Sequence, residues 1–365
     1  MIIKIKEKLI GSKHPCFIIA EVGVNHNGDI NLAKKLIDEA KKAGVDAVKF
    51  QTFKSEQLVT PDAEQAEYQT KNIGQKESQY LMLKKLELSY SDFRELKNYC
   101  DNMGIIFLST PHSCKEDIDL VSELSPAIKI ASGDLTNLPM LEYVARKNLP
   151  IILSTGMSDL DEVKEAVDTI IPINKGLILL HCTTNYPTAI KEVNLKAMKT
   201  MADAFNLPTG YSDHTEGINV SLAAVVLGAV VIEKHFTLDK DLIGPDHRAS
   251  LEPEKLASLV KGIREIEARL VKEEPKAILK ELKAEEAMGD GIKKPTEKEK
   301  EVIGVARKSI IAAENIKKGT IINEDMLTIK RPGTGILPKY INQIVGKAAK
   351  EDIKKDSLIK WEQIG

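Results

Sequence analysis

Eight short apolar runs follow one another along the first two thirds of this chain, and polar residues stand at or just beyond the end of nearly every run. Amphipathic helical stretches separate the runs, which are typical of buried parallel strands. This alternation predicts a (β/α)₈ TIM barrel, in which chemistry gathers at the C-terminal ends of the strands. The strand ends carry Glu21, Asn25, Lys49, Gln51, Ser109, Thr110, Lys129, Ser132, Ser154, His181, Asn185, Tyr186, Tyr211, Ser212, His214, Glu233 and His235.

A helix is expected after each strand, with its apolar face toward the sheet. The first helix places Leu32 and Leu36 on one face with lysines opposite, and Gly44 suits its C-terminal end. The connection 54–79 is long and polar, and long loops on this face of a barrel commonly form lids or subunit contacts. The expected helices span residues 30–43, 91–102, 115–123, 138–147, 160–170, 194–202, 217–227 and 253–272.

The 365 residues exceed the roughly 250 that a barrel uses, so a second unit is expected. We assign residues 1–282 to the barrel and residues 283–303, rich in lysine and glutamate, to an exposed linker. Residues 304–365 regain short apolar runs broken by turn signals, which predicts a compact, loop-rich β module. About 60 residues make a marginal core, so the module is expected to lean on another surface.

Composition excludes several classes of partner. The 52 lysines and arginines nearly balance 54 acidic residues, which leaves no basic excess for nucleic acid or an anionic membrane surface. No apolar run approaches the ~20 residues of a membrane span, and the first residues alternate as a β-hairpin does, unlike a signal peptide. The four cysteines show no CxxC or zinc spacing, which favours buried free thiols. We expect a cytoplasmic protein that binds neither nucleic acid nor membrane.

The strongest local signal is GYSDHT followed by IEKHF. Side chains alternate along a strand, so Glu233 and His235 point one way and Lys234 the other. If the last two strands are neighbours, His214 and His235 can converge on one metal ion at the barrel mouth. The alternative is two separate polar histidines. Two imidazoles suit zinc, iron, nickel or copper by softness, so the residues alone do not select magnesium or manganese.

Lysines form the second constellation. Period-two alternation directs Lys49 and Gln51 inward, and Lys129 again stands where a barrel strand ends. Because a buried ammonium without anionic company is costly, these lysines predict a phosphate or carboxylate pocket that uses the hydroxyls of Ser132, Ser154 and Ser212. They can also pair internally with Glu21 and Glu233, or one of them can form a Schiff base as in class I aldolases.

Three further segments are ambiguous by themselves. EVGVNHNGD is explained by a tight polar turn around Asn25. GPDHRAS places Asp246 and His247 on the last barrel loop, where they could bind hydroxyls. RPGTGI presents Arg331 on a turn, where most arginines are simply solvated.

Taken together, these motifs resemble the sialic acid synthase family over almost the whole chain. The tail resembles that family's antifreeze-like SAF domain. Each motif is weak alone, but their fixed order with an appended β module is specific. The motifs are AEVGVNHNG, VKFQTF, KIASGD, LSTGM, CTTNYP, GYSDHT, IEKHFT, GPDH and RPGTGI.

The resemblance implies condensation of phosphoenolpyruvate with an open-chain N-acetylmannosamine-type sugar. C3 of phosphoenolpyruvate attacks the sugar aldehyde, water adds at C2, and phosphate leaves by C–O cleavage. It implies Mn²⁺ or Mg²⁺ on His214 and His235, polarising the aldehyde oxygen. The implied anion-binding residues are Lys49, Lys129, Ser132, Ser154, Asn185 and Ser212. The residues implied to contact the sugar or move protons are Glu21, Gln51, Tyr186, Glu233 and Asp246, with His235 beside them.

The family also implies a domain-swapped homodimer, in which Arg331 of one subunit reaches the sugar's N-acyl group in the other. The favoured product is N-acetylneuraminate. Alternatives are legionaminate synthase, which uses 2,4-diacetamido-2,4,6-trideoxymannose, pseudaminate synthase, and a pyruvate-dependent aldolase. A different class, a non-catalytic sugar-binding protein working through its SAF domain, would not need both lysines and both histidines.

Overall fold

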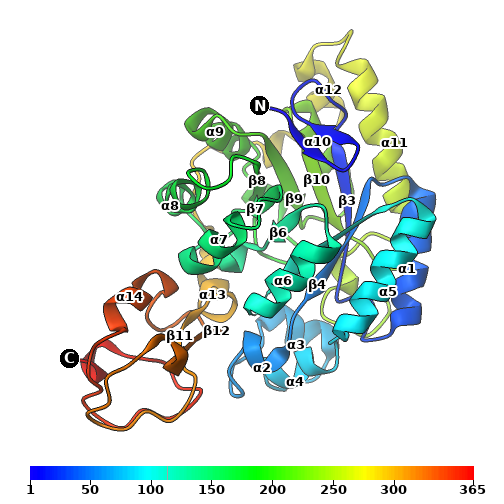
Figure 1. The fold of residues 1–365 in the computed structure, drawn as a ribbon. Coiled ribbons are helices and arrows are strands. Elements are labelled where there is room, and N and C mark those ends of the chain that lie inside the picture. Colours follow the sequence, from blue (N-terminus) through cyan, green and yellow to red (C-terminus); the bar gives the residue numbers. More distant parts are fainter. Residues whose placement is uncertain (113) are drawn as a thin grey trace.

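A closed barrel of eight parallel strands forms the body of the protein (Figure 1). The computed structural model describes residues 1–112 and 114–365. Neighbouring strands pair in chain order, and β10 closes the barrel by pairing with β3, with Val231 opposite Phe17. The predicted TIM barrel is confirmed. Its strands are β3 (Phe17–Gly23), β4 (Ala47–Thr52), β5 (Ile106–Pro111), β6 (Ile128–Ile130), β7 (Ile151–Ser154), β8 (Leu177–Cys182), β9 (Thr209–Asp213) and β10 (Val231–His235).

Helices surround this barrel and bury their apolar faces against the strands. Each predicted helix is present with ends shifted by a few residues. Gly44 ends α1 with a positive φ, as its position suggests. The helices are α1 (Ile30–Ala43), α5 (Tyr90–Met103), α6 (Lys115–Leu124), α7 (Leu138–Ala145), α8 (Leu160–Ile170), α9 (Lys196–Phe205), α10 (Asn219–Val226) and α11 (Pro253–Arg269).

Alternation along the strands divides the barrel interior into an apolar base and a polar mouth. In β3, for example, Phe17 and Ile19 pack in the interior base while Glu21 reaches the mouth. The predicted N-terminal hairpin, β1 (Ile3–Ile5) with β2 (Lys8–Ile10), closes the base with buried isoleucines (Figure 1). The base is therefore a packed core, and ligands can enter only at the mouth.

The connection after β4 is more structured than a plain loop. It holds three short helices, α2 (Ser55–Leu58), α3 (Glu67–Ile73) and α4 (Gln79–Lys84), packed around their own apolar cluster. These helices lie at the mouth end of the barrel (Figure 1) and contribute side chains to its wall. The connection expected to form a lid or a subunit contact is thus a small helical cap.

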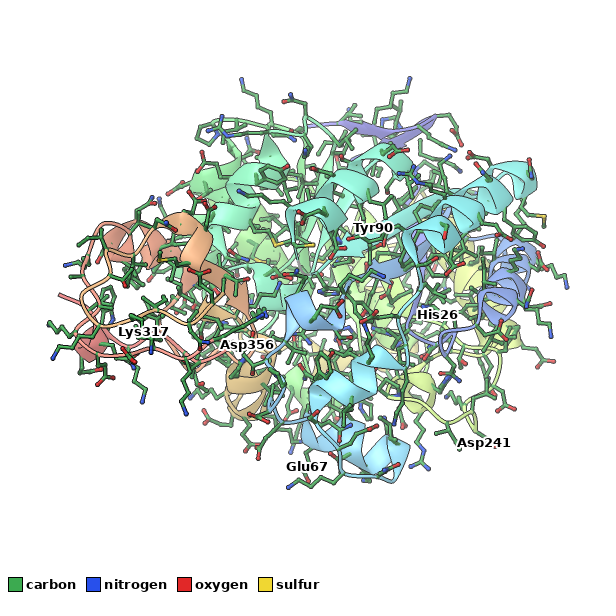
Figure 2. All side chains as sticks on the ribbon, turned by 60° about the horizontal axis from the view of Figure 1, so that its bottom comes forward. His26, Glu67, Tyr90, Asp241, Lys317 and Asp356 are labelled. Atoms are coloured by element: carbon green, nitrogen blue, oxygen red, sulfur yellow. The ribbon has the colours of Figure 1, made fainter. Side chains whose placement is uncertain are left out.

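Beyond α12 (Pro275–Glu281), the chain crosses the mouth end and enters the C-terminal module. The crossing contains α13 (Glu297–Ala306), and Lys293 and Glu299 are buried there, so the expected exposed linker packs on the barrel instead. The module pairs β11 (Ser309–Ala312) with β12 (Leu327–Lys330), adds α14 (Ile341–Ile344) and has an isoleucine-rich core. In Figure 2, Lys317 and Asp356 mark this module beside the barrel.

Two further expectations concern the whole chain. In the part that the structure describes, no helix has the length and apolar character to cross a bilayer. Cys16, Cys100 and Cys182 are buried free thiols, as their spacing suggests.

Candidate active site

A cavity of about 150 Å³ opens at the C-terminal ends of the barrel strands. Its floor is formed by side chains that alternate inward from the strands, and its walls come from the helical cap, from α13 and from Arg331 of the C-terminal module. Among the predicted site residues, the cavity wall includes Glu21, Lys49, Gln51, Lys129, Ser132, Ser154, Tyr186, Ser212, His214, Glu233, His235, Asp246 and Arg331.

The cavity floor is a network of buried lysines and glutamates. Lys49 Nζ lies 2.6 Å from Glu21 Oε2 and 3.6 Å from Glu233 Oε2. Lys129 Nζ lies 3.5 Å from Glu233 Oε1 and donates to Ser154 Oγ at 2.7 Å. Both lysines therefore have carboxylate partners within the floor, which is the internal pairing with Glu21 and Glu233 that the sequence allows.

Burial and mutual attraction set the ionisation of this network. Burial alone would raise the pKa of Glu233, but Lys129 and Lys49 lower it to about 2. Burial raises the pKa of Glu21 above its usual value. Burial opposes charge on both lysines. The pKa of Lys49 nevertheless rises because of Glu21 and Glu233, whereas that of Lys129 falls. The Lys49 ammonium thus stays charged and can be shared with an incoming anion.

Two imidazoles face each other beside this floor. The ring centroids of His214 and His235 are 5.4 Å apart in an edge-to-face arrangement, and the Tyr186 ring lies against both. His214 Nδ1 lies 2.8 Å from the carbonyl oxygen of Thr183, which leaves Nε2 available as a lone-pair donor. Buried His235 Nδ1 has no hydrogen-bond partner among the described residues.

These two rings are compatible with a bound divalent ion but do not complete a site alone. Burial lowers the pKa of His235 well below its usual value, which keeps the ring neutral and able to ligate. Among the described residues, no cluster of three histidine, cysteine, aspartate or glutamate side chains could hold a metal. The remaining ligands would therefore be substrate or water, so the predicted metal stays a prediction.

The rim carries groups suited to a hydroxylated ligand. Asp246 Oδ2 lies 3.9 Å from His235 Nδ1, and burial together with Glu21 raises the pKa of Asp246 to about 7. Tyr68 from the cap stacks on Tyr186, with ring centroids 5.1 Å apart. A polar, aromatic rim of this kind can orient a sugar by hydrogen bonds and ring contacts.

Arg331 enters the rim from the C-terminal module of the same chain. Its backbone N–H donates to Leu58 O at 2.9 Å, and its carbonyl accepts from Thr60 N at 3.0 Å, beside the cap. Its Nη1 lies 3.4 Å from Gln79 Oε1. Arg331 is thus a half-buried cavity residue and not a solvated turn residue. Its predicted exchange between subunits stays a prediction.

Several polar residues singled out in the sequence lie away from the described cavity wall. Asn185 is not part of that wall. His181 points outward to the carbonyl oxygen of Val193 at 2.7 Å. His247, expected to bind hydroxyls, is instead fixed by Thr237 at 2.7 Å. His181 faces outward because side chains alternate along β8, and both histidines hold loops in place.

Other wall residues escaped the sequence interpretation. Cys182 lies inward, with its Sγ 3.7 Å from His214 Nδ1; consistent alternation from His181 would have indicated it. Burial opposes charge on His214, but Cys182 raises the pKa of that imidazole. Gln69 and Gln79 of the cap and the apolar face of α13 also line the cavity, and no sequence motif marked them.

Fold and site together define a TIM-barrel protein with an anion-binding floor, paired imidazoles and a mouth completed by an appended domain. The NeuB family model matches residues 36–275, and the SAF domain model matches residues 307–365. The chain belongs to the NeuB family.

Two curated relatives align over nearly the full length. N,N'-diacetyllegionaminic acid synthase of Legionella pneumophila is 47% identical, covering 97% of this chain and 96% of the relative. The protein of that name from Campylobacter jejuni is 49% identical, and the alignment covers 94% of this chain and 98% of the relative. The crystal structure of spore coat polysaccharide biosynthesis protein SpsE from Bacillus subtilis is 36% identical, with a TM-score of 0.84 and coverage of 100% and 99%.

Proposed function

We propose that this enzyme condenses phosphoenolpyruvate, an open-chain N-acetylated amino sugar and water into a nonulosonic acid and inorganic phosphate. The observation that carries the proposal is the buried Lys49–Lys129 pair beside His214 and His235 in one cavity. An anion site next to a carbonyl-activating site is what joining these two substrates requires. The names of the relatives supply the reaction class.

The anion floor would bind phosphoenolpyruvate through Lys49, Lys129 and the hydroxyls of Ser132, Ser154 and Ser212. An arriving phosphate or carboxylate competes with Glu21 and Glu233 for the two ammonium groups. A glutamate that loses its lysine partner becomes more basic. It can then take the proton from the water that adds to C2. The C2–O bond to phosphate breaks in the step that follows.

The sugar would occupy the rim, where Tyr186, Asp246 and Arg331 can contact its hydroxyl and N-acyl groups. His214 and His235 would hold Mn²⁺ or Mg²⁺, which when bound polarises the aldehyde oxygen. Gln51 donates to Glu21 Oε1 at 3.0 Å and keeps that carboxylate oriented toward the cavity. The new carbon–carbon bond joins C3 of phosphoenolpyruvate to the aldehyde carbon.

For the acceptor, we propose 2,4-diacetamido-2,4,6-trideoxymannose, which makes the product legionaminate. Both curated relatives at 47% and 49% identity carry the legionaminic acid name. This choice replaces the N-acetylneuraminate favoured from motifs alone, which becomes the second candidate with N-acetylmannosamine as acceptor.

Phosphate release by the purified protein tests acceptor and reaction together. The protein is given phosphoenolpyruvate, Mn²⁺ and one of the two acceptors at equal concentration. We expect a higher kcat/KM with the diacetamido sugar. A higher value with N-acetylmannosamine would return the assignment to neuraminate synthesis, and no phosphate release with either would reject the proposed reaction.

A pyruvate-dependent aldolase is the other chemistry the floor could support, because the lowered pKa of Lys129 favours a neutral amine. Borohydride reduction with pyruvate would then trap an adduct on that lysine. We expect none, and Lys129→Met should instead weaken phosphoenolpyruvate use about 10- to 150-fold, the range for a charge-assisted hydrogen bond. Lys42→Met, on the exposed face of α1, is the control.

A further inference from the structure

The crossing segment of residues 293–308, here named the strap, passes over the mouth ends of the barrel between α12 and β11. It contains α13, which lies between the barrel and the C-terminal module (Figure 1). Val302, Val305 and Ala306 of this helix line the site cavity. The strap is outside the (β/α)₈ repeat, yet it forms part of the site.

Glu299 attaches the strap to the barrel loops. Only 2% of its surface is exposed, although the neighbouring acidic residues of α13 are exposed. Its Oε1 accepts from the backbone N–H of Met157 at 2.7 Å and of Thr184 at 2.8 Å. Its Oε2 accepts from Thr296 N at 2.9 Å. One buried carboxylate therefore satisfies amides from two separate barrel loops.

Both loops belong to the anion floor. Met157 follows Ser154 at the end of β7, and its neighbour Gly156 donates its N–H to Ser132 Oγ at 2.9 Å. Thr184 follows β8 and lies in the cavity wall. Through these bonds, Glu299 links the loops after β7 and β8 directly and the segment after β6 through Gly156. Ser132 and Ser154, two of the residues proposed to bind phosphoenolpyruvate, adjoin these links.

The ends of the strap are fixed to the same loops. Lys293 Nζ donates to Ser158 O, and Arg307 donates to Met157 O at 2.8 Å. Lys308 Nζ lies 2.6 Å from Asp134 Oδ1 in a fully buried pair. The packing at this end is close, since a Cβ added to Gly133 would lie 2.6 Å from the carbonyl oxygen of Ala306.

We infer that Glu299 is a positioning residue for anion recognition. It holds the backbone of the loops after β7 and β8 in the conformation in which the Gly156 N–H fixes Ser132 Oγ and Ser154 borders the floor. The identity of the anion as phosphoenolpyruvate rests on the proposed function. The competing explanation is that Glu299 only fastens α13 and contributes stability without affecting ligand affinity.

The test compares Glu299→Ala with Glu301→Ala, an exposed glutamate on the same helix. In Glu299→Ala, the KM for phosphoenolpyruvate should rise about tenfold or more, as expected for lost bonds to a charged acceptor. The acceptor KM should change less than about twofold, because the rim groups keep their contacts. Glu299→Gln retains one acceptor oxygen, so its KM for phosphoenolpyruvate should lie between those of the wild type and Glu299→Ala. Glu301→Ala should match wild type.

Two measurements on the full chain do not depend on turnover. Calorimetry measures the affinity for inorganic phosphate, and hydrogen exchange followed by mass spectrometry reports peptides containing Met157 and Thr184. We expect weaker phosphate binding and faster exchange in Glu299→Ala than in Glu301→Ala. If the alanine variant does not fold, Glu299→Gln is judged by the same measurements.

Unchanged phosphate affinity in a folded Glu299 variant would overturn the inference, as would an equal rise in the KM of both substrates. Failure of the proposed function looks different. A wild-type protein that binds phosphate but releases none from phosphoenolpyruvate with any acceptor would reject the reaction. Loss of phosphate affinity in Glu299→Ala would still support the positioning role.

Discussion

The two imidazoles at the mouth are held together by strand geometry. His235 is the last residue of β10, and His214 follows directly after β9, its neighbour in the barrel. Lys234 of β10 points away from the cavity, and its Nζ lies 2.9 Å from Asp213 Oδ2 of β9. This ion pair fixes the two strand ends to each other on the outer side of the barrel. His235 is thus presented by its strand, and His214 by the residue position directly after its strand.

If these rings bind the aldehyde-polarising ion, chelation should abolish product formation and Mn²⁺ should restore it. His235→Ala should lower kcat more than about a hundredfold, because Lewis-acid stabilisation is worth several kcal/mol. Phosphoenolpyruvate binding, followed by calorimetry, should persist. His14→Ala, at the closed base of the barrel, serves as control. Full activity in excess EDTA would remove the metal from the mechanism.

His26 makes folding stability depend on pH. Burial lowers its pKa from 6.5 to about 4, and its Nδ1 accepts from Gly28 N at 3.0 Å. Between those pH values the unfolded chain binds a proton that the folded protein does not. The free energy of unfolding therefore falls as pH drops from 6.5 to 4. A shift of this size corresponds to roughly 3 kcal/mol.

We expect His26→Asn, which keeps an acceptor for Gly28 N, to flatten this pH dependence. Urea unfolding at several pH values measures the slope. His112 and His247, whose pKa values burial lowers to about 4, should leave a residual slope in the variant. Identical slopes in wild type and variant would mean that His26 is protonated equally in both states.

At the scale of single elements, backbone packing is close where β9 meets its neighbours. A Cβ added to Gly210 would lie 2.8 Å from Leu180 Cδ2 and 2.9 Å from Val231 Cβ, and would also meet Val231 O. A glycine at this point lets three strands approach inside the barrel.

Gly210→Ala should therefore destabilise the protein by at least about 2 kcal/mol, since a backbone oxygen cannot rotate away. Gly304→Ala, where the nearest contact is Thr334 Cγ2 at 3.5 Å, should be neutral or slightly stabilising in its helix. Thermal unfolding of both variants makes the comparison. Equal melting temperatures would contradict this account of the barrel packing.

Local patterns were sufficient to predict the barrel elements and most of the cavity floor. Period-two alternation correctly oriented Lys49 and His235, because interior and exterior side chains alternate along every barrel strand. The same alternation turns His181 outward and Cys182 inward, so the polar residue of that strand end was a misleading guide to the cavity. Glu299 could not be predicted, because its role depends on where a charged, low-complexity segment packs in three dimensions.

On the scale of the whole molecule, barrel and C-terminal module meet through buried and half-buried ion pairs. Arg307 binds Glu162 with both guanidinium nitrogens at 2.7 Å, next to the Lys308–Asp134 pair. Arg331 lies beyond this junction and enters the mouth. The module therefore completes the site, and its removal should leave a folded barrel without turnover.

Mixing two inactive variants tests whether neighbouring subunits exchange their modules. The Arg331→Ala subunit has an intact barrel site, and the His235→Ala subunit has an intact Arg331. If a dimer exchanges modules, freely mixed subunits should recover about a quarter of wild-type sites by symmetric pairing. If Arg331 serves its own barrel, as in this single chain, heterodimers should recover nothing. Phosphate release and native mass spectrometry together decide between the two arrangements.

Closure of the barrel by β10 against β3 also has a consequence for how the protein is made. The first barrel strand leaves the ribosome long before Val231 exists to pair with Phe17. At about 5–20 residues per second, that delay is on the order of ten to forty seconds. Throughout it, β3 presents an open edge to any other extended chain. Yield in a cell should therefore depend on protection of the unfinished barrel during synthesis more than on the stability of the finished protein.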